Sequence, residues 1–135
     1  MIWTSTDIES AARTVYGEAR GETEQGKIAV AWVIRNRVKR GGWWGDNADT
    51  VCRFPWQFSC WNDHNKEKLL AAGLDDEAFR QCLIAVAAVF SGIAEDPTGG
   101  CAHYHVASLP FPKSWGEPRE PHITIGNHKF YLGIK

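Results

Sequence analysis

Glu18 is the residue whose type and position point most directly to chemistry, because it stands between two glycines in the run Y-G-E-A-R-G-E at residues 16–22. Apolar residues recur at helical spacing before it, and projection along a helix places Glu18 at the border of the apolar stripe. A half-buried carboxylate at the negative end of a helix is disfavoured in its ionised form, as a general acid requires. Alternatively, Glu18 and Glu22 are solvated charges that pair with Arg13 or Arg20. Spacing alone leaves both alternatives open.

Two helices are expected to position this carboxylate. The capping pattern T-D-I-E at residues 6–9 predicts that the first helix begins within it. Thr23 can cap a second helix over residues 24–40, whose middle is apolar on every side. A helix of that kind is typical of the buried centre of a domain, so we expect the core to form around it. The polar pair Asn36 and Arg37 near its end must find hydrogen-bond partners.

The remaining segments complete a domain of mixed type. Residues 42–65 are rich in Gly, Trp, Asp and Pro, which predicts irregular loops with one hairpin through residues 54–61. A short helix is expected over residues 66–72, followed by a longer one that the Asp75-Asp76 pair caps. After a turn, short extended segments are predicted at residues 102–106 and 122–125. The fold class is therefore α+β with helices dominant.

The bulk properties narrow the classes of partner. A length of 135 residues fits a single domain spanning residues 1–135. The 15 basic and 16 acidic residues balance, which argues against nucleic acid or an anionic membrane surface as a partner. The apolar stretches are too short to span a bilayer, and no signal-peptide pattern follows Met1. We expect a monomer that is made in the cytoplasm without a signal peptide and needs no cofactor.

The four cysteines show no C-x-x-C pairing, so neither a zinc ribbon nor a thioredoxin-type motif is supported. Buried free thiols are the expected state for Cys52, Cys60, Cys82 and Cys101. The alternative is a disulfide between Cys52 and Cys60, which a hairpin could bring together.

Four segments in combination resemble the SleB/CwlJ-type cell-wall hydrolase family. They are Y-G-E-A-R-G-E, the following A-V-A-W-V-I-R-N-R-V, then P-W-Q-F-S-C-W and finally D-P-T-G-G-C-A-H-Y-H. The likeness runs from about Ala11 to about His105. It implies a lysozyme-like domain that cleaves the glycan strand of peptidoglycan at the β-1,4 bond between N-acetylmuramic acid and N-acetylglucosamine. The resemblance also implies that Glu18 is the catalytic acid.

A glycan groove needs flat apolar surfaces for sugar rings and polar side chains at their edges. In the predicted hairpin, Gln57, Ser59 and Trp61 would share one face by their period-two spacing, with Phe58 and Cys60 on the core side. We therefore expect these three residues to bind substrate. Alternatively, Trp56 and Trp61 simply pack in the core.

The H-x-H triplet at residues 103–105 allows two roles. The two imidazoles would share one strand face at a spacing also used by metal ligands, although hydrogen-bonded histidines are far commoner. In the resembled family this position is aromatic-rich, so Tyr104 is the best-matched candidate for lining the cleft. We expect no metal. A metal-dependent amidase that uses these histidines with Cys101 is a rival function without a supporting H-E-x-x-H motif.

The reaction type depends on whether a second carboxylate assists Glu18. Hydrolysis of this kind commonly uses one, but Asp46, Asp49 and Asp63 resemble turn residues, and Gly21 is expected to break the geometry between Glu22 and Glu18. A lytic transglycosylase needs only one carboxylate, so 1,6-anhydromuramic acid is the expected product. The alternatives are a hydrolytic muramidase and a non-catalytic peptidoglycan-binding protein. Without a signal peptide, action on the wall is expected after release, as for a phage-type endolysin, or by an unidentified export route. A bacterial housekeeping or germination enzyme is the alternative setting.

Overall fold

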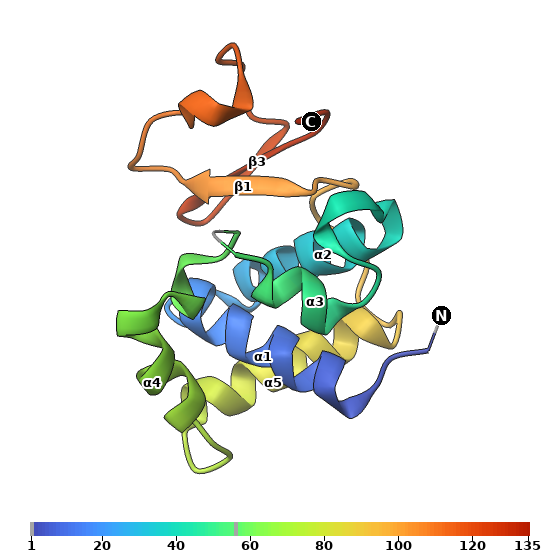
Figure 1. The fold of residues 1–135 in the computed structure, drawn as a ribbon, viewed down its shortest axis with the longest axis vertical. Helices are drawn as coiled ribbons and strands as arrows, with labels where there is room; N and C mark the ends of the chain where they lie inside the picture. The colour runs from blue at the N-terminus through green and yellow to red at the C-terminus, as the bar shows by residue number, and fades with distance from the viewer. Residues whose placement is uncertain (1, 56) are drawn as a thin grey trace.

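The computed structural model describes residues 2–55 and 57–135, in which a helical body carries a small sheet on one side (Figure 1). The α-helices are α1 (Ser5–Ala19), α2 (Glu24–Arg40), α3 (Ala48–Arg53), α4 (Asp63–Ala71) and α5 (Glu77–Phe90). Short 3-10 helices are η1 (Gly42–Trp44), η2 (Ser59–Trp61) and η3 (Lys113–Trp115). The strands β1 (His103–Val106), β2 (Ile123–Ile125) and β3 (His128–Tyr131) form an antiparallel sheet in the order β1-β3-β2.

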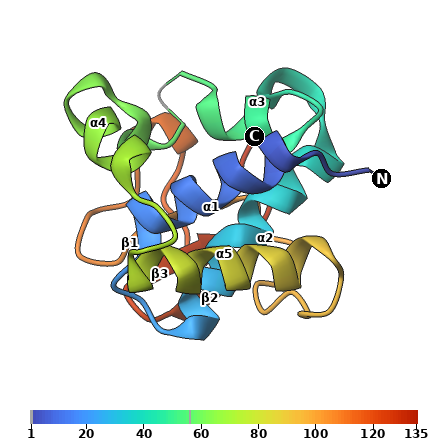
Figure 2. The same cartoon turned by 90° about the horizontal axis from the view of Figure 1, so that it is seen from below.

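The core lies between α1, α2 and α5. Helices α1 and α5 lie side by side in both views (Figures 1 and 2), and α2 contacts both of them. The apolar middle of α2, residues 28–34, is buried apart from the partly buried Trp32. The prediction of a buried central helix is confirmed, as are its cap at Thr23 and its end at Gly41. The fold class, α+β with helices dominant, is confirmed as well.

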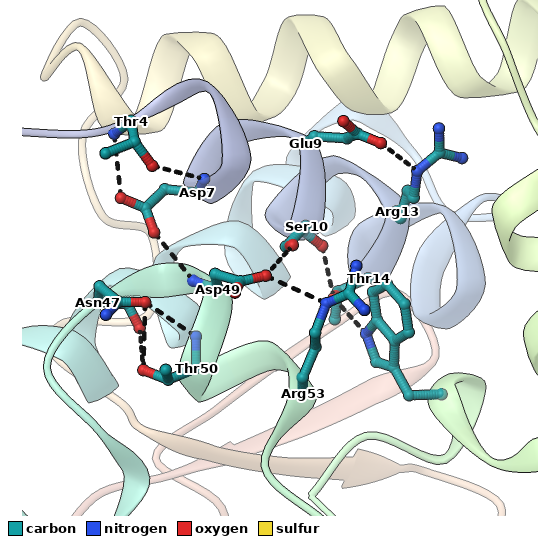
Figure 3. Close-up of polar contacts among 11 residues, drawn as sticks. Thr4, Asp7, Glu9, Ser10, Arg13, Thr14, Asn47, Asp49, Thr50 and Arg53 are labelled. Carbon is teal, nitrogen blue, oxygen red and sulfur yellow. Dashed lines mark hydrogen bonds and ion pairs between the residues drawn. The ribbon is translucent and has the colours of Figure 1, made fainter.

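The start of α1 differs from the prediction. Thr4 is the cap: its hydroxyl accepts from the Asp7 amide at 3.1 Å, and the Asp7 carboxylate accepts from the Thr4 amide at 3.0 Å. The expected pairing within residues 6–9 is wrong, because Glu9 instead pairs with Arg13. The second Asp7 oxygen accepts from the Asp49 amide, so a contact with α3 helps to place the cap at Thr4 (Figure 3). The same figure shows Ser10 donating to the Asp49 carboxylate.

The hairpin predicted over residues 54–61 is wrong. The Trp61 amide donates to the Phe58 carbonyl and the Asn62 amide to the Ser59 carbonyl, so local turns satisfy the backbone in place of cross-strand bonds. Phe58 and Cys60 are buried as predicted, but they reach the core from a turn and from η2. Trp56 lies outside the described residues.

The C-terminal part agrees with the prediction of extended segments and adds β3, which pairs with both other strands.

The four cysteines are free and buried, so the alternative of a disulfide between Cys52 and Cys60 is wrong. Among the residues that the structure describes, none of the helices has the length and apolar character needed to cross a membrane.

Candidate active site

Glu18 occupies the last turn of α1, and its side chain is half-buried as predicted. Its Oε1 accepts a hydrogen bond of 2.6 Å from the Tyr104 hydroxyl, which projects from β1. The alternative in which Glu18 pairs with Arg13 or Arg20 is wrong, because Arg13 binds Glu9 and the carbonyls of Leu69 and Ala72, and Arg20 lies over the Tyr16 ring. The end of α1 and the first strand therefore hold this carboxylate together.

Tyr104 is held in place as a hydrogen-bond donor to Glu18. Its ring packs edge-on against His128, with centroids 5.0 Å apart, and lies 5.5 Å from the Phe130 ring. Burial and then the charge of Glu18 raise the pKa of the Tyr104 phenol well above its ordinary value. The phenol therefore keeps its proton at neutral pH.

Gly17 lets the segment after α3 approach Glu18 closely. A Cβ atom at Gly17 would lie 2.3 Å from Cβ and 2.8 Å from Sγ of Cys60. Burial and then the charge of Glu18 raise the pKa of the Cys60 thiol, so this buried neutral group lies near the carboxylate. The glycine before Glu18 is thus required by packing.

Arg37, at the end of α2, brings a buried positive charge to the site. Its Nε donates to the Ala102 carbonyl at 2.8 Å, and its guanidinium lies over the rings of Trp44 and Phe58 at 5.1 and 4.9 Å. Nη1 has no hydrogen-bond partner among the described residues. Burial lowers the pKa of Arg37 to about 10, so the side chain stays charged at neutral pH.

Glu18, Tyr104 and Arg37 border a cleft of about 300 Å³. Its lining joins α1, α2, β1 and η3: Glu18, Arg37, Gln57, His103, Tyr104, His105, Val106, Ser114 and Trp115. Within this described lining, Glu18 is the single carboxylate. The Trp115 ring packs edge-on against His103 and His105, with centroids 5.2 and 5.9 Å apart. The two histidines thus share a partner, as expected for alternate strand positions.

The residues predicted to bind substrate divide between different surroundings. Gln57 and Tyr104 line the cleft with Glu18. Ser59 lines a neighbouring cavity of about 190 Å³ with Arg20 and Lys68. Trp61 donates its indole N–H to Thr14 Oγ1 at 2.8 Å and lies under Arg53. Gln57, Ser59 and Trp61 therefore do not share one face. The 3-10 helix η2 turns successive side chains around its axis, whereas a strand would point them alternately to two faces.

The other acidic candidates serve structural contacts. The Asp49 carboxylate accepts from the Ser10 hydroxyl of α1 and pairs with Arg53 on α3. The Asp46 carboxylate accepts from the side-chain amide of Asn47. The side chain of Asp63 lies outside what the structure describes. Glu22 accepts from the backbone and side-chain N–H groups of Asn127, each at 2.9 Å.

Glu22 therefore joins the loop after α1 to the turn between β2 and β3. Burial raises the pKa of Glu22, but the two bonds from Asn127, together with the charges of His128 and Lys27, lower the pKa overall. A Cβ atom at Gly126 would lie 2.4 Å from Glu22 Oε1, so the turn needs glycine for this approach.

Arg37, His103 and Trp115 also line the cleft, although none of them is among the predicted site residues. Arg37 carried a usable signal, since a charged residue near the end of a buried helix needs partners. Trp115 carried none, because only the path of the loop between β1 and β2 brings it to the histidines.

A helix-dominated domain with a glutamate at the end of its first helix, facing a small sheet across a cleft, belongs to the lysozyme-like class. The family model described as Cell Wall Hydrolase matches residues 21–131, and the chain belongs to this family. The matched range begins just after Glu18, whereas one curated relative and two solved structures match 95–97% of the chain, Glu18 included.

Two solved structures are similar to it. One is the catalytic domain of the germination-specific lytic transglycosylase SleB from Bacillus anthracis, with a TM-score of 0.74 and 30% identity over 96% of this chain and 97% of that one. The other is the catalytic domain of the Bacillus cereus SleB protein, with a TM-score of 0.71 and 28% identity over 97% of this chain and 93% of that one.

A spore cortex-lytic enzyme of Halalkalibacterium halodurans is 34% identical over 128 residues, which are 95% of this chain and 35% of that protein. The spore cortex-lytic enzyme of Bacillus subtilis is 50% identical over 36 residues, which are 27% of this chain and 12% of that protein. The chain thus spans about a third or less of the length of these relatives.

Proposed function

We propose that this chain cleaves the glycan strand of peptidoglycan between N-acetylmuramic acid and N-acetylglucosamine as a lytic transglycosylase. The observation that carries the proposal is the cleft in which Glu18 is the single carboxylate of the described lining and is held by Tyr104. A mechanism that uses one carboxylate twice fits this lining better than hydrolysis assisted by a second acid. The similarity to a SleB catalytic domain named as a lytic transglycosylase supports the same reaction.

In the first step, Glu18 donates its proton to the glycosidic oxygen while the bond from that oxygen to C1 of muramic acid breaks. The carboxylate that forms is stabilised by the hydrogen bond from Tyr104. In the second step, the C6 hydroxyl of the same muramic acid attacks C1, and its proton passes to Glu18. The product is a 1,6-anhydromuramic end, and Glu18 is again protonated for the next cycle.

The test of the acid is Glu18→Gln, which keeps the shape of the side chain and removes the transferable proton. We expect cleavage of purified peptidoglycan, followed by turbidity, to fall by about 10³-fold, because general acid and general base catalysis are both lost. Glu22→Gln is the matched control, because it removes the charge of the next carboxylate along the chain. Glu22 accepts from Asn127, and neither residue lines the cleft.

The control should keep cleavage within about threefold, since it leaves the proton donor in place. The circular dichroism spectrum of both variants should match the parent. A folded Glu18→Gln variant with the full rate would overturn the role of Glu18, and equal losses in both variants would show that charge near the cleft, rather than the proton of Glu18, controls the rate.

A further inference from the structure

A second cavity, of about 380 Å³, adjoins the cleft. His103 lines both, and its directly paired partner across the sheet, Tyr131, lines the second cavity. His105, which lines the cleft, is hydrogen-bonded to the Tyr131 hydroxyl at 2.8 Å. The two cavities therefore share strand β1 as a common wall, and a hydrogen bond from β3 links the second cavity to the cleft. Figure 1 shows the end of α2 and the loop after it beside the start of β1, where this cavity lies.

The second cavity is positively charged, and we call it the cationic cavity. Lys39 and Arg40, from the last turn of α2, line it, and both are exposed. Neither Lys39 nor Arg40 forms an ion pair within the part of the chain that the structure describes. The described lining of the cationic cavity contains no acidic side chain. Arg37, one turn earlier, lines the adjoining cleft, and its buried Nη1 has no hydrogen-bond partner among the described residues. Three cations thus extend from the site of Glu18 into the cationic cavity.

The helix dipole explains only part of this arrangement. Basic residues in the last turn of a helix complement its negative end, which accounts for exposed cations at Lys39 and Arg40. It does not account for Arg37, which is 4% exposed although burying an incompletely bonded guanidinium is costly. Burial and then the charge of Glu120 raise the pKa of Tyr131, but Glu120 itself does not line the cavity. Asp96 is the carboxylate next to the lining, and it is already bonded to Asn36 and the Gly100 amide. The charged side chains in the lining itself are the cations Lys39 and Arg40, which suit an anion.

We propose that the cationic cavity binds carboxylates of the stem peptide carried by the muramic acid residue whose bond is cleaved at Glu18. The proposal rests on the function proposed above. The stem peptide is attached through the lactyl group of muramic acid, so it leaves the strand at the sugar whose C1–oxygen bond breaks when Glu18 donates its proton. Lysine and arginine bind carboxylates through charge-assisted hydrogen bonds. The volume is in the usual range of small-ligand pockets, roughly 300–1,000 Å³.

The first experiment compares cleavage of peptide-bearing glycan strands with cleavage of the same strands after an amidase has removed their peptides. We expect kcat/KM of the parent to be about tenfold higher on the peptide-bearing strands. The Lys39→Gln/Arg40→Gln double variant should lose this preference and keep the parent rate on bare strands. Lys66→Gln/Arg80→Gln, which removes two charges outside the cavity lining, should keep the preference. A double variant that keeps the preference, or a parent that has none, overturns the proposal.

The second experiment separates this proposal from the reaction itself. A soluble N-acetylmuramyl peptide has no glycosidic bond to cleave, so its binding by calorimetry does not depend on catalysis. We expect about tenfold weaker binding by Lys39→Gln/Arg40→Gln, and a similar loss in the parent when the carboxylates of the peptide are amidated. This result supports the cavity even if no strand is cleaved, in which case the proposed reaction alone fails. Equal binding by parent and double variant overturns the cavity whatever the cleavage result.

Discussion

The hydrogen bond from Tyr104 to Glu18 is the contact on which the site depends at the scale of single residues. It joins the end of the first helix to the first strand, and the partly buried phenol is held in its protonated form. A donor that cannot lose its proton at neutral pH serves both halves of the reaction, because it orients the acid before proton transfer and stabilises the carboxylate after it.

Tyr104→Phe removes that bond and keeps the ring that packs on His128 and Phe130. We expect kcat to fall by about 10- to 100-fold, which is the value of one hydrogen bond to a charged group, with little change in the melting temperature. Tyr16→Phe is the control, since the Tyr16 hydroxyl binds Asp76 away from the cleft and its loss should change kcat by less than about twofold. Equal kcat in the Tyr104→Phe variant and the parent would contradict the role of Tyr104.

His103 gives the molecule a pH dependence that can be measured separately. Burial, with the charges of Arg37 and Arg40, lowers the pKa of His103 from 6.5 to about 4. Between these two values the unfolded chain binds a proton that the folded chain does not, so the free energy of unfolding falls as the pH falls through this window. The expected loss is on the order of 3 kcal/mol between pH 7 and pH 4.

Urea unfolding at a series of pH values checks this expectation. In His103→Gln that part of the pH dependence should disappear, while the contributions of the carboxylates stay the same in both proteins and cancel in the difference. Parallel curves for parent and variant across the window would show that His103 is protonated equally in the folded and unfolded states.

At the scale of elements, the sequence predicts what is encoded locally. Thr23 and Gly41 bound α2, and the apolar run between them marks its buried course, because caps and periodicity act within a few residues. The Gly, Trp, Asp and Pro content around Cys60 predicts a hairpin, yet this segment forms η2 and buries Phe58 and Cys60 without a strand. Thr4 was missed as a cap because the partner of Asp7 lies on α3.

Gly17→Ala tests the packing that brings η2 to Glu18. The new Cβ atom would collide with Cys60, so we expect a destabilisation of about 1–3 kcal/mol in urea unfolding, with a loss of cleavage as η2 moves. Gly21→Ala is the matched control, because nothing lies within 4 Å of a Cβ atom there. Equal stability of the two variants would contradict the close contact between Gly17 and Cys60.

At the scale of the whole molecule, the fold class and the half-buried position of Glu18 could be predicted, because both depend on local pattern and on motifs spread over most of the chain. The partners of Glu18 could not be predicted in the same way. Tyr104 lies 86 residues further along and was selected only through a family resemblance, and Arg37 and Trp115 join the cleft through the sheet and its loop. Contacts of this range depend on topology, which spacing does not encode.

The free thiols report on the integrity of the whole core. Burial raises the pKa of Cys52 to about 12 and those of Cys82 and Cys101 to about 11, and all four thiols are buried. We expect the folded protein to react slowly with a disulfide reagent at pH 8 and to expose four thiols in urea without reductant. Reductant should leave the melting temperature unchanged. Fewer thiols in the unfolded protein would mean that a disulfide is present.

The central claim is that Glu18 alone acts as acid and then as base, and the products test it most directly. Purified peptidoglycan would be digested in isotopically labelled water and the fragments analysed by mass spectrometry. The account predicts 1,6-anhydromuramic ends, each lighter by one water than a hydrolysed end and free of label from the solvent. Reducing muramic acid ends that carry solvent label would contradict it, because they require a water molecule as the nucleophile.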